Sequence, residues 1–243
     1  MTDYRTSSWF WLWSRLYESL WGGLKEQILP NTEGLYRIRG GPGRGIRVLT
    51  NPAHGGTRLL LGLYEPCLMK WLVRTVKPGS IVYDVGSASG HEALIAAKLA
   101  GPDGLVFAFE PDEAARGKME INLEANPDLA KRIRVLPFLV GNRHDPGDGM
   151  VTIDRVGGEF SIPYPDVVKI DVEGAECKVL EGMERLAQIR CPHAFVECHV
   201  GPDIEGRVRG FFARHRVPVR RSSPSFFEVS RRGYNAWVWT KKL

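Results

Sequence analysis

A carboxylate followed by a glycine-rich loop is the most informative chemical feature of this sequence. In the segment IVYDVGSASGHEAL (residues 81–94), an apolar run ends near Asp84, and the loop beyond it holds Gly86, Ser87 and Gly90. The glycines permit tight turns and close approach of a ligand, and a helix N-terminus with free N–H groups follows. The spacing is not the GxGxxG of dinucleotide sites, and a carboxylate here would repel phosphate. Asp84 therefore indicates a ligand with positive charge, such as the amino group of an amino acid.

A second acid, Glu110, ends the next apolar run, LVFAFEP, twenty residues after Gly90. An acid at this place accepts hydrogen bonds from both ribose hydroxyls of a nucleoside. A nucleoside joined to a cationic amino acid is S-adenosylmethionine, so the loop and the acid together predict this cofactor. The alternative is a Rossmann-like domain that binds another nucleotide or none.

Polar side chains also follow two later apolar runs. VVKIDVEG places Lys169 and Asp171 on one face of an expected strand, with Glu173 just beyond, and AFVECH places Glu197 and His199 in the same way. For Asp171 we expect acceptor positioning or general-base catalysis. The alternative is that Asp171 or Glu173 caps the helix that follows.

His199 is a candidate base because histidine has an unperturbed pKa near neutrality, and Glu197 would orient it or contact the acceptor. The two could hold a metal ion together with Asp171, but methyl transfer has no obligatory metal and the sequence predicts none. A buried, purely structural Glu–His pair is the alternative. Weaker candidates for contact with the substrate are Glu65, Lys169 and Glu173.

The elements that must position these residues alternate from about residue 60 onward. Short apolar runs without polar alternation are typical of a parallel sheet covered by helices on both faces, an α/β fold. The expected strands are 81–85, 105–109, 133–140, 166–172 and 194–198, with a terminal hairpin of 225–230 and 234–240. The expected helices are 64–76, 91–100, 112–126 and 175–188.

Residues 1–59 are expected to form an extension outside a catalytic domain of residues 60–243. Residues 9–21 contain four tryptophans and place three of them, Trp9, Trp13 and Trp21, on the apolar face of an amphipathic helix. Such a helix packs on protein, including a second copy in a homo-oligomer, or lies on a membrane surface. The segment GGPGRG, residues 40–45, is interpreted as the connector between extension and domain.

The composition restricts the class of protein. Of 243 residues, 43% are hydrophobic and 25% charged, and no apolar run approaches the roughly 20 residues of a membrane-spanning helix. The four cysteines show no CxxC spacing, which favours reduced thiols in a cytoplasmic protein. The net charge of +5 is uneven, because residues 61–200 carry 15 basic and 21 acidic side chains while both flanks are basic. A basic flank meets an anionic partner or is a solvated face.

Over residues 60–200 the sequence resembles the FkbM family of S-adenosylmethionine-dependent methyltransferases. The motifs that carry the resemblance, in the family's order, are GLYEP, VYDVGSASG, FAFEPD, VTIDRV, VVKIDVEGAECKVLEG and PHAFVECH. The resemblance implies the class I methyltransferase fold, a seven-stranded and mostly parallel sheet whose last strand runs antiparallel. It also implies a hydroxyl acceptor, for which we expect a small molecule or a glycan.

By the same resemblance, cofactor positions are Asp84, Gly86, Gly90 and Glu110, to which Ser87 in the same loop is added. Asn142 falls where such enzymes often bind adenine. Ala88 stands where the family's loop usually has asparagine, so one polar contact to the cofactor is in doubt.

Two other functions stay open at this point. RNA methylation is motivated by the basic flanks, but the sequence lacks an NPPY-like loop and any recognisable RNA-binding module, so we expect no nucleic-acid partner. A catalytically silent protein that binds the cofactor and a partner is motivated by Ala88.

Overall fold

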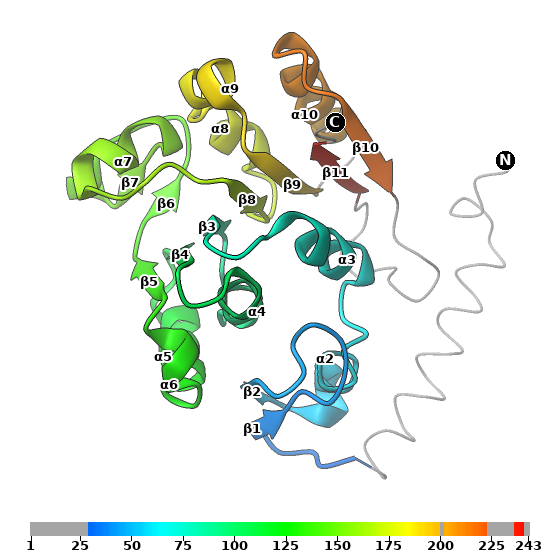
Figure 1. Cartoon of the computed structure of the whole chain (residues 1–243). Coiled ribbons are helices and arrows are strands. Elements are labelled where there is room, and N and C mark those ends of the chain that lie inside the picture. Colours follow the sequence, from blue (N-terminus) through cyan, green and yellow to red (C-terminus); the bar gives the residue numbers. More distant parts are fainter. Residues whose placement is uncertain (1–28, 200–201, 223–235, 241–243) are drawn as a thin grey trace, which may run out of the picture. The chain divides into compact units, whose positions relative to one another are not determined.

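Seven strands form one sheet in the computed structural model, which describes residues 29–199, 202–222 and 236–240 (Figure 1). The strand order is β10-β11-β9-β8-β3-β4-β5, and β11 runs antiparallel to both of its neighbours. The expected seven-stranded, mostly parallel sheet with an antiparallel last strand is confirmed. The strands are β3 (Ile81–Val85), β4 (Leu105–Phe109), β5 (Ile133–Leu136), β8 (Val167–Ile170), β9 (His193–Cys198), β10 (Val219–Ser222) and β11 (Ala236–Thr240).

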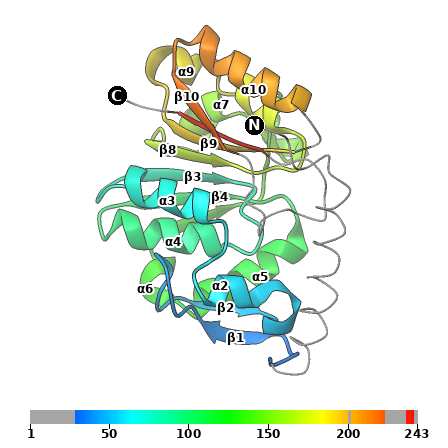
Figure 2. The same ribbon diagram turned by 90° about the vertical axis from the view of Figure 1, so that its right-hand side faces the viewer.

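Helices cover both faces of this sheet (Figure 2). On one face α3 and α4 pack against the strands, and the Trp71 ring of α3 lies 5.3 Å from the Phe195 ring of β9. On the other face, apolar residues of α7 to α10 form one core with alternate strand residues such as Val168 and Ile170. The helices are α3 (Pro66–Thr75), α4 (His91–Ala100), α5 (Glu113–Glu124), α6 (Pro127–Ala130), α7 (Ile153–Phe160), α8 (Glu176–Glu181), α9 (Glu184–Arg190) and α10 (Pro202–Arg214).

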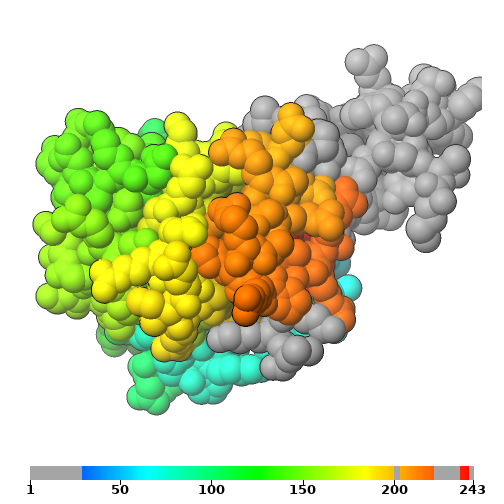
Figure 3. Space-filling view, turned by 90° about the horizontal axis from the view of Figure 1, so that it is seen from above, coloured from blue at the N-terminus to red at the C-terminus, as the bar shows by residue number. Residues whose placement is uncertain are grey.

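The alternation of side chains along β8 and β9 decides where the polar residues lie. Val168 and Ile170 enter the core with α7 to α10, so Lys169 must project toward the face covered by α3 and α4. All four residues of β8 are buried, as expected for a central parallel strand. Seen from above, the segments of α8, α9 and α10 lie next to one another on the opposite side of the sheet (Figure 3).

Three expected elements differ from the structure. The strand expected over 133–140 ends at Leu136, because Pro137 has no N–H for the ladder. The next residues form β6 (Leu139–Val140), which pairs with β7 (Met150–Val151) outside the main sheet. The helix expected over 175–188 is two helices, α8 and α9. The partner of β11 in the terminal hairpin is β10, whereas residues 225–230 lie outside the described residues.

The chain divides into two compact units, Met1–Tyr64 and Glu65–Leu243. In the first unit β1 (Gly34–Arg37) and β2 (Arg47–Thr50) form an antiparallel hairpin, followed by the helical turn η2 (Pro52–Gly56) and α2 (Thr57–Leu60). Residues 40–45 are the turn of this hairpin, so their interpretation as a connector between domains was wrong. The tryptophan-rich helix predicted at 9–21 lies outside the described residues. Among the residues that are described, no helix has the length and apolar character to cross a membrane.

Candidate active site

The loop between β3 and α4 has a backbone that requires glycine. Gly86 has φ 79° and Gly90 has φ 77°, both in the left-handed region. A Cβ on Gly86 would lie 1.8 Å from the carbonyl oxygen of Asp171, so the loops after β3 and β8 touch backbone to backbone. Ala88, between the two glycines, also has a positive φ of 45°. The family's asparagine at this position therefore has a conformational reason, because asparagine tolerates this region better than alanine does.

Glu110 joins this loop to the end of β4. Its Oε2 accepts a hydrogen bond from the backbone N–H of Ala88 at 2.7 Å, and its Oε1 accepts one from the N–H of Asp112 at 2.9 Å. The side chain is buried, with 8% of its surface exposed. Each carboxylate oxygen keeps a second lone pair, so Glu110 is held in place while it can still accept hydrogen bonds from a ligand.

A cavity of about 310 Å³ lies beside Glu110, at the carboxyl ends of β3, β4 and β8. This is where parallel α/β sheets bind ligands, and the volume is within the range of small-molecule sites. The lining residues are mostly apolar: Val85, Gly86, Ala88, Phe109, Glu110, Pro111, Ala115, Phe138, Leu139, Val140, Asp171, Val172, Glu173 and Ala175. The lining therefore combines the glycine loop and three carboxylates, those of Glu110, Asp171 and Glu173, with apolar side chains.

Of the predicted cofactor residues, Gly86 and Glu110 line this cavity, whereas four others do not. Ser87 is fully buried, and its hydroxyl donates to the carbonyl oxygen of Asp84 at 2.7 Å. Asn142 is exposed, and its amide donates to Glu181 Oε2 at 2.8 Å. The remaining two that do not line the cavity are Asp84 and Gly90.

Asp84 faces a buried lysine. Its Oδ1 lies 3.2 Å from Nζ of Lys169, its direct neighbour across the β3–β8 ladder. Lys169 also donates to the carbonyl oxygen of Gly86 at 2.8 Å and lies 3.5 Å from Asp171 Oδ2. Burial lowers the pKa of Lys169, but the surrounding carboxylates outweigh burial and hold it well above its usual value. Lys169 therefore stays charged and ties both loops to the sheet, a different task from the substrate contact predicted for it.

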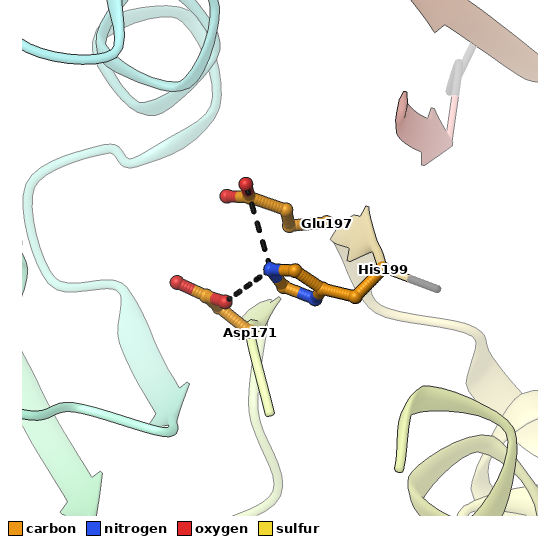
Figure 4. A group of neighbouring side chains, drawn as sticks. All are labelled: Asp171, Glu197 and His199. Carbon is orange, nitrogen blue, oxygen red and sulfur yellow. Dashed lines mark ion pairs between the residues drawn. The ribbon is translucent and has the colours of Figure 1, made fainter. Parts of the chain in front are cut away.

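Asp171, Glu197 and His199 come together at the ends of β8 and β9, and their side chains point toward a common centre (Figure 4). Nε2 of His199 lies 3.5 Å from Asp171 Oδ1 and 3.7 Å from Glu197 Oε1. One ligand atom of each residue lies within 4.8 Å of the other two. We refer to these three residues as the acceptor cluster. Asp171 also lines the cavity, so the cavity and the acceptor cluster share one side chain.

The environment separates the pKa values of the acceptor cluster. Burial, with a further contribution from Asp171, raises the pKa of Glu197 to about 7. Burial lowers the pKa of His199, but its hydrogen bond with Glu176 and the nearby carboxylates outweigh burial, so this pKa lies above its usual value. Hence Glu197 has a pKa suited to a base near neutral pH.

Two acids near the cluster were undervalued from the sequence. Glu176 is fully buried, and its Oε1 lies 2.6 Å from Nδ1 of His199. The motif KIDVEGAE contains Glu176, and its place in this motif, five residues past Asp171, was the only signal available. Glu65, predicted only as a weak contact, has a buried Oε2, and burial followed by the charges of Glu92 and Glu197 raises its pKa to about 8.

Left-handed backbone occurs at several non-glycine residues of this region. Among the described residues, Glu65 has φ 39° and Glu173 has φ 49°, in addition to Ala88. Strained conformations of this kind persist where surrounding structure holds them, often at functional sites. Glu173 is exposed and lines the cavity. The expectation that Asp171 or Glu173 caps the next helix was wrong, because the N-cap of α8 is Ala175 and no side chain caps it.

Comparison with known proteins finds a protein family whose model matches the part of the chain that holds this site. The family described as "Methyltransferase FkbM domain" matches residues 148–219, which include the acceptor cluster. Over these residues the chain is similar to FkbM methyltransferases. A hexuronic acid methyltransferase, AglP, from Haloferax volcanii is 29% identical over 163 residues, covering 57% of this chain and 64% of AglP. The match thus spans a little under two thirds of that relative.

Solved structures of methyltransferases share the fold of this chain. A methyltransferase FkbM from Methylobacillus flagellatus KT has a TM-score of 0.53 at 16% identity, covering 98% of this chain and 62% of that one. A putative rRNA-methylase from Clostridium thermocellum has a TM-score of 0.50 at 14% identity, covering 71% of this chain and 93% of that one. At these identities the likeness concerns the fold, which is the class I methyltransferase fold expected from the sequence.

Proposed function

We propose that this protein is an S-adenosylmethionine-dependent methyltransferase that methylates a hydroxyl group of a small molecule or glycan. The observation that carries the proposal is the shared position of Asp171, which lines the cavity on one side and belongs to the acceptor cluster on the other. A donor in the cavity and an acceptor at the cluster would therefore meet beside one carboxylate.

The cavity fits the cofactor that the family implies. Glu110 offers two carboxylate oxygens with spare lone pairs, as the paired hydroxyls of a ribose require. Phe138 and Leu139 give the apolar surface that a purine ring needs. The contact between Asn142 and adenine stays a prediction, since the Asn142 amide donates to Glu181.

The predicted contact between Asp84 and the cofactor's amino group also needs revision. Asp84 is 2% exposed and paired with Lys169, so we propose that it acts by fixing the glycine loop. Lys169 does the same through the Gly86 carbonyl.

The chemical task of the protein's own residues is to remove the proton from the acceptor hydroxyl. When bound, the cofactor supplies a methyl group on a sulfonium sulfur, which keeps the electron pair of the broken C–S bond as a neutral thioether. The acceptor oxygen that gains the methyl group releases one proton, and the acceptor cluster must take it. Glu197, whose pKa is about 7, is suited to that role, while Asp171 positions the hydroxyl and His199 lies between the two carboxylates.

The charge of the site favours a hydroxyl over a carboxylate acceptor. AglP is named for hexuronic acid, a sugar that carries both groups. Around the cluster lie the carboxylates of Glu65, Asp171, Glu176 and Glu197, and the nearest buried lysine already holds Asp84. A second carboxylate brought to this place would be repelled, whereas a neutral hydroxyl can donate to one of them. We therefore infer transfer to a sugar-like hydroxyl.

The test is a transfer screen with isotope-labelled S-adenosylmethionine against hydroxylated metabolites, glycans, uronic acids and RNA, read by mass spectrometry. We expect label on a hydroxyl oxygen of a small molecule or glycan. Label on RNA or on a carboxylate oxygen would contradict the proposal, and cofactor binding without any transfer would favour a silent binding protein. The expected cytoplasmic location, and association through residues 9–21 with a second copy or a membrane surface, rest on the sequence alone.

A further inference from the structure

The acceptor cluster has the spacing of a set of metal ligands. The distances of 3.5 Å and 3.7 Å from His199 Nε2 to the two carboxylates are too long for good hydrogen bonds. Ligand atoms bound to one cation at about 2.0–2.2 Å lie roughly 3.0–4.4 Å from one another. The two distances from His199 are at that scale, and one ligand atom from each of the three residues lies within 4.8 Å of the others (Figure 4).

The orientation of His199 is a second and separate observation. Glu176 Oε1 lies 2.6 Å from Nδ1 of His199 and also accepts from the backbone N–H of Gly174 at 2.9 Å. A carboxylate can only accept, so Nδ1 carries a proton, and in the neutral form of the ring the lone pair is then on Nε2. Histidines that ligate metals are oriented in this way by a carboxylate behind them. Glu176 is fully buried, and its contact with Nδ1 holds the His199 ring so that Nε2 faces two further carboxylates.

Acidic side chains outnumber basic ones around the cluster. Six acids lie close together at the ends of these strands: Glu65, Asp84, Glu92, Asp171, Glu176 and Glu197. The cationic groups among them are Lys169 and, when protonated, His91 and His199. Among the described residues, Oε2 of Glu65 is buried and accepts no hydrogen bond. A buried excess of negative charge is costly unless a cation accompanies it.

We propose that Asp171, Glu197 and His199 bind a divalent cation through one carboxylate oxygen each and Nε2. Two oxygens and one nitrogen suit Mn²⁺ better than cations that prefer oxygen alone. The remaining coordination positions would face the acceptor. A hydroxyl bound to the cation would lose its proton more easily, and this catalytic role of the cation rests on the proposed function. Each carboxylate keeps its second oxygen to accept that proton. The site departs from the sequence-based expectation of no metal.

The test is a titration of the full-length protein, without cofactor, with MnCl₂ followed by electron paramagnetic resonance of the free ion. We expect one Mn²⁺ bound per chain. Glu197→Gln, which keeps the size of the side chain, should weaken binding more than about 100-fold, and Glu176→Gln about 10- to 100-fold because it acts through His199. The matched control is Glu120→Gln, which changes an exposed carboxylate of α5 and should bind as the unchanged protein does.

No binding at millimolar Mn²⁺, or equal affinity in Glu197→Gln and Glu120→Gln, would overturn the proposal, and a proton on Nε2 would then hold the cluster together. If circular dichroism shows that a variant is unfolded, the site is tested instead in the unchanged protein by nuclear magnetic resonance of isotope-labelled histidines. The His199 ring signals should broaden with substoichiometric Mn²⁺, and unchanged signals would reject the site. A parallel titration with S-adenosylhomocysteine separates the two proposals, because cofactor binding without Mn²⁺ binding rejects only the metal site. Mn²⁺ binding without cofactor binding rejects only the proposed function.

Discussion

The two sides of Asp171 are built by different physical means. On the cavity side, the contacts are made by a glycine loop, backbone N–H groups and apolar side chains, with Glu110 as the principal fixed carboxylate. On the acceptor side, carboxylates and histidine are buried together, and Glu197 and His199 both have raised pKa values. The first side depends on backbone shape and the second on charge. Substitutions on the two sides should therefore affect different measurements.

The largest effect is expected from Asp171→Asn. The variant keeps the shape of the side chain but removes the charge that faces the acceptor hydroxyl and Lys169. Turnover on the acceptor found in the transfer screen should fall by about 10²- to 10⁴-fold, the range of general acid–base contributions. Steady-state kinetics measures it, and a melting temperature close to that of the unchanged protein is the control for folding. Near-normal turnover would show that the acceptor does not meet this carboxylate.

Gly86→Ala should affect stability, because the cavity side depends on close backbone contact. The new Cβ would lie 1.8 Å from the Asp171 carbonyl oxygen, and the residue already has φ 79°. We expect the free energy of unfolding to fall by more than about 2 kcal/mol in a denaturant titration. The matched control is Gly117→Ala in α5, where a Cβ meets nothing within 4 Å and should add about 0.5–1 kcal/mol. Equal behaviour of the two variants would contradict the close contact.

Glu65→Gln tests the excess of charge through the pH dependence of stability. The pKa of Glu65 is about 8 in the folded protein against an ordinary value of 4.5, so the folded state binds more protons between these values. Folding stability therefore falls as the pH rises through that window. The variant should melt above the unchanged protein at pH 8, and the two should converge near pH 4.5. Parallel melting curves at every pH, as expected for the exposed control Glu120→Gln, would contradict the burial of this charge.

The smallest effect is expected at Ala88. Its φ of 45° costs alanine about 1–2 kcal/mol that glycine does not incur, partly offset by the greater freedom of glycine in the unfolded chain. Ala88→Gly should raise the free energy of unfolding by about 0.5–1 kcal/mol. Ala114→Gly, in the first turn of α5, should instead lower it. A loss at both positions would mean that the loop is not strained.

The sequence predicted best those features that repeat along the chain. The apolar runs at 81–85 and 105–109 are β3 and β4 with no change of boundary, and the i, i+2 spacing correctly placed Lys169 and Asp171 together. Turns and breaks were predicted less well. The break at Pro137 depends on one missing N–H, and the glycine-rich turn at 40–45 has the same composition in a hairpin as in a linker.

Within the site, sequence spacing predicted which side chains end up near one another but not which groups they bind. The carboxylates of Asp84 and Asp171 share Lys169, and Glu176 reaches His199 from a different element. Such pairings depend on distances between strands and helices far apart in the chain, which no local pattern contains. The pKa of His199 shows the consequence. Histidine's ordinary value suggested a base, whereas three surrounding carboxylates raise it.

The central claim is that Glu110 serves the cofactor while Asp171 serves the acceptor, and calorimetric titration with S-adenosylhomocysteine tests it without knowledge of the acceptor. Glu110→Gln should weaken binding by about 1.5–3 kcal/mol, the range for hydrogen bonds to a charged group. Asp171→Asn and the exposed control Glu120→Gln should bind as the unchanged protein does. Unchanged affinity in Glu110→Gln, or an equal loss in Asp171→Asn, would contradict the division of the site into these two sides.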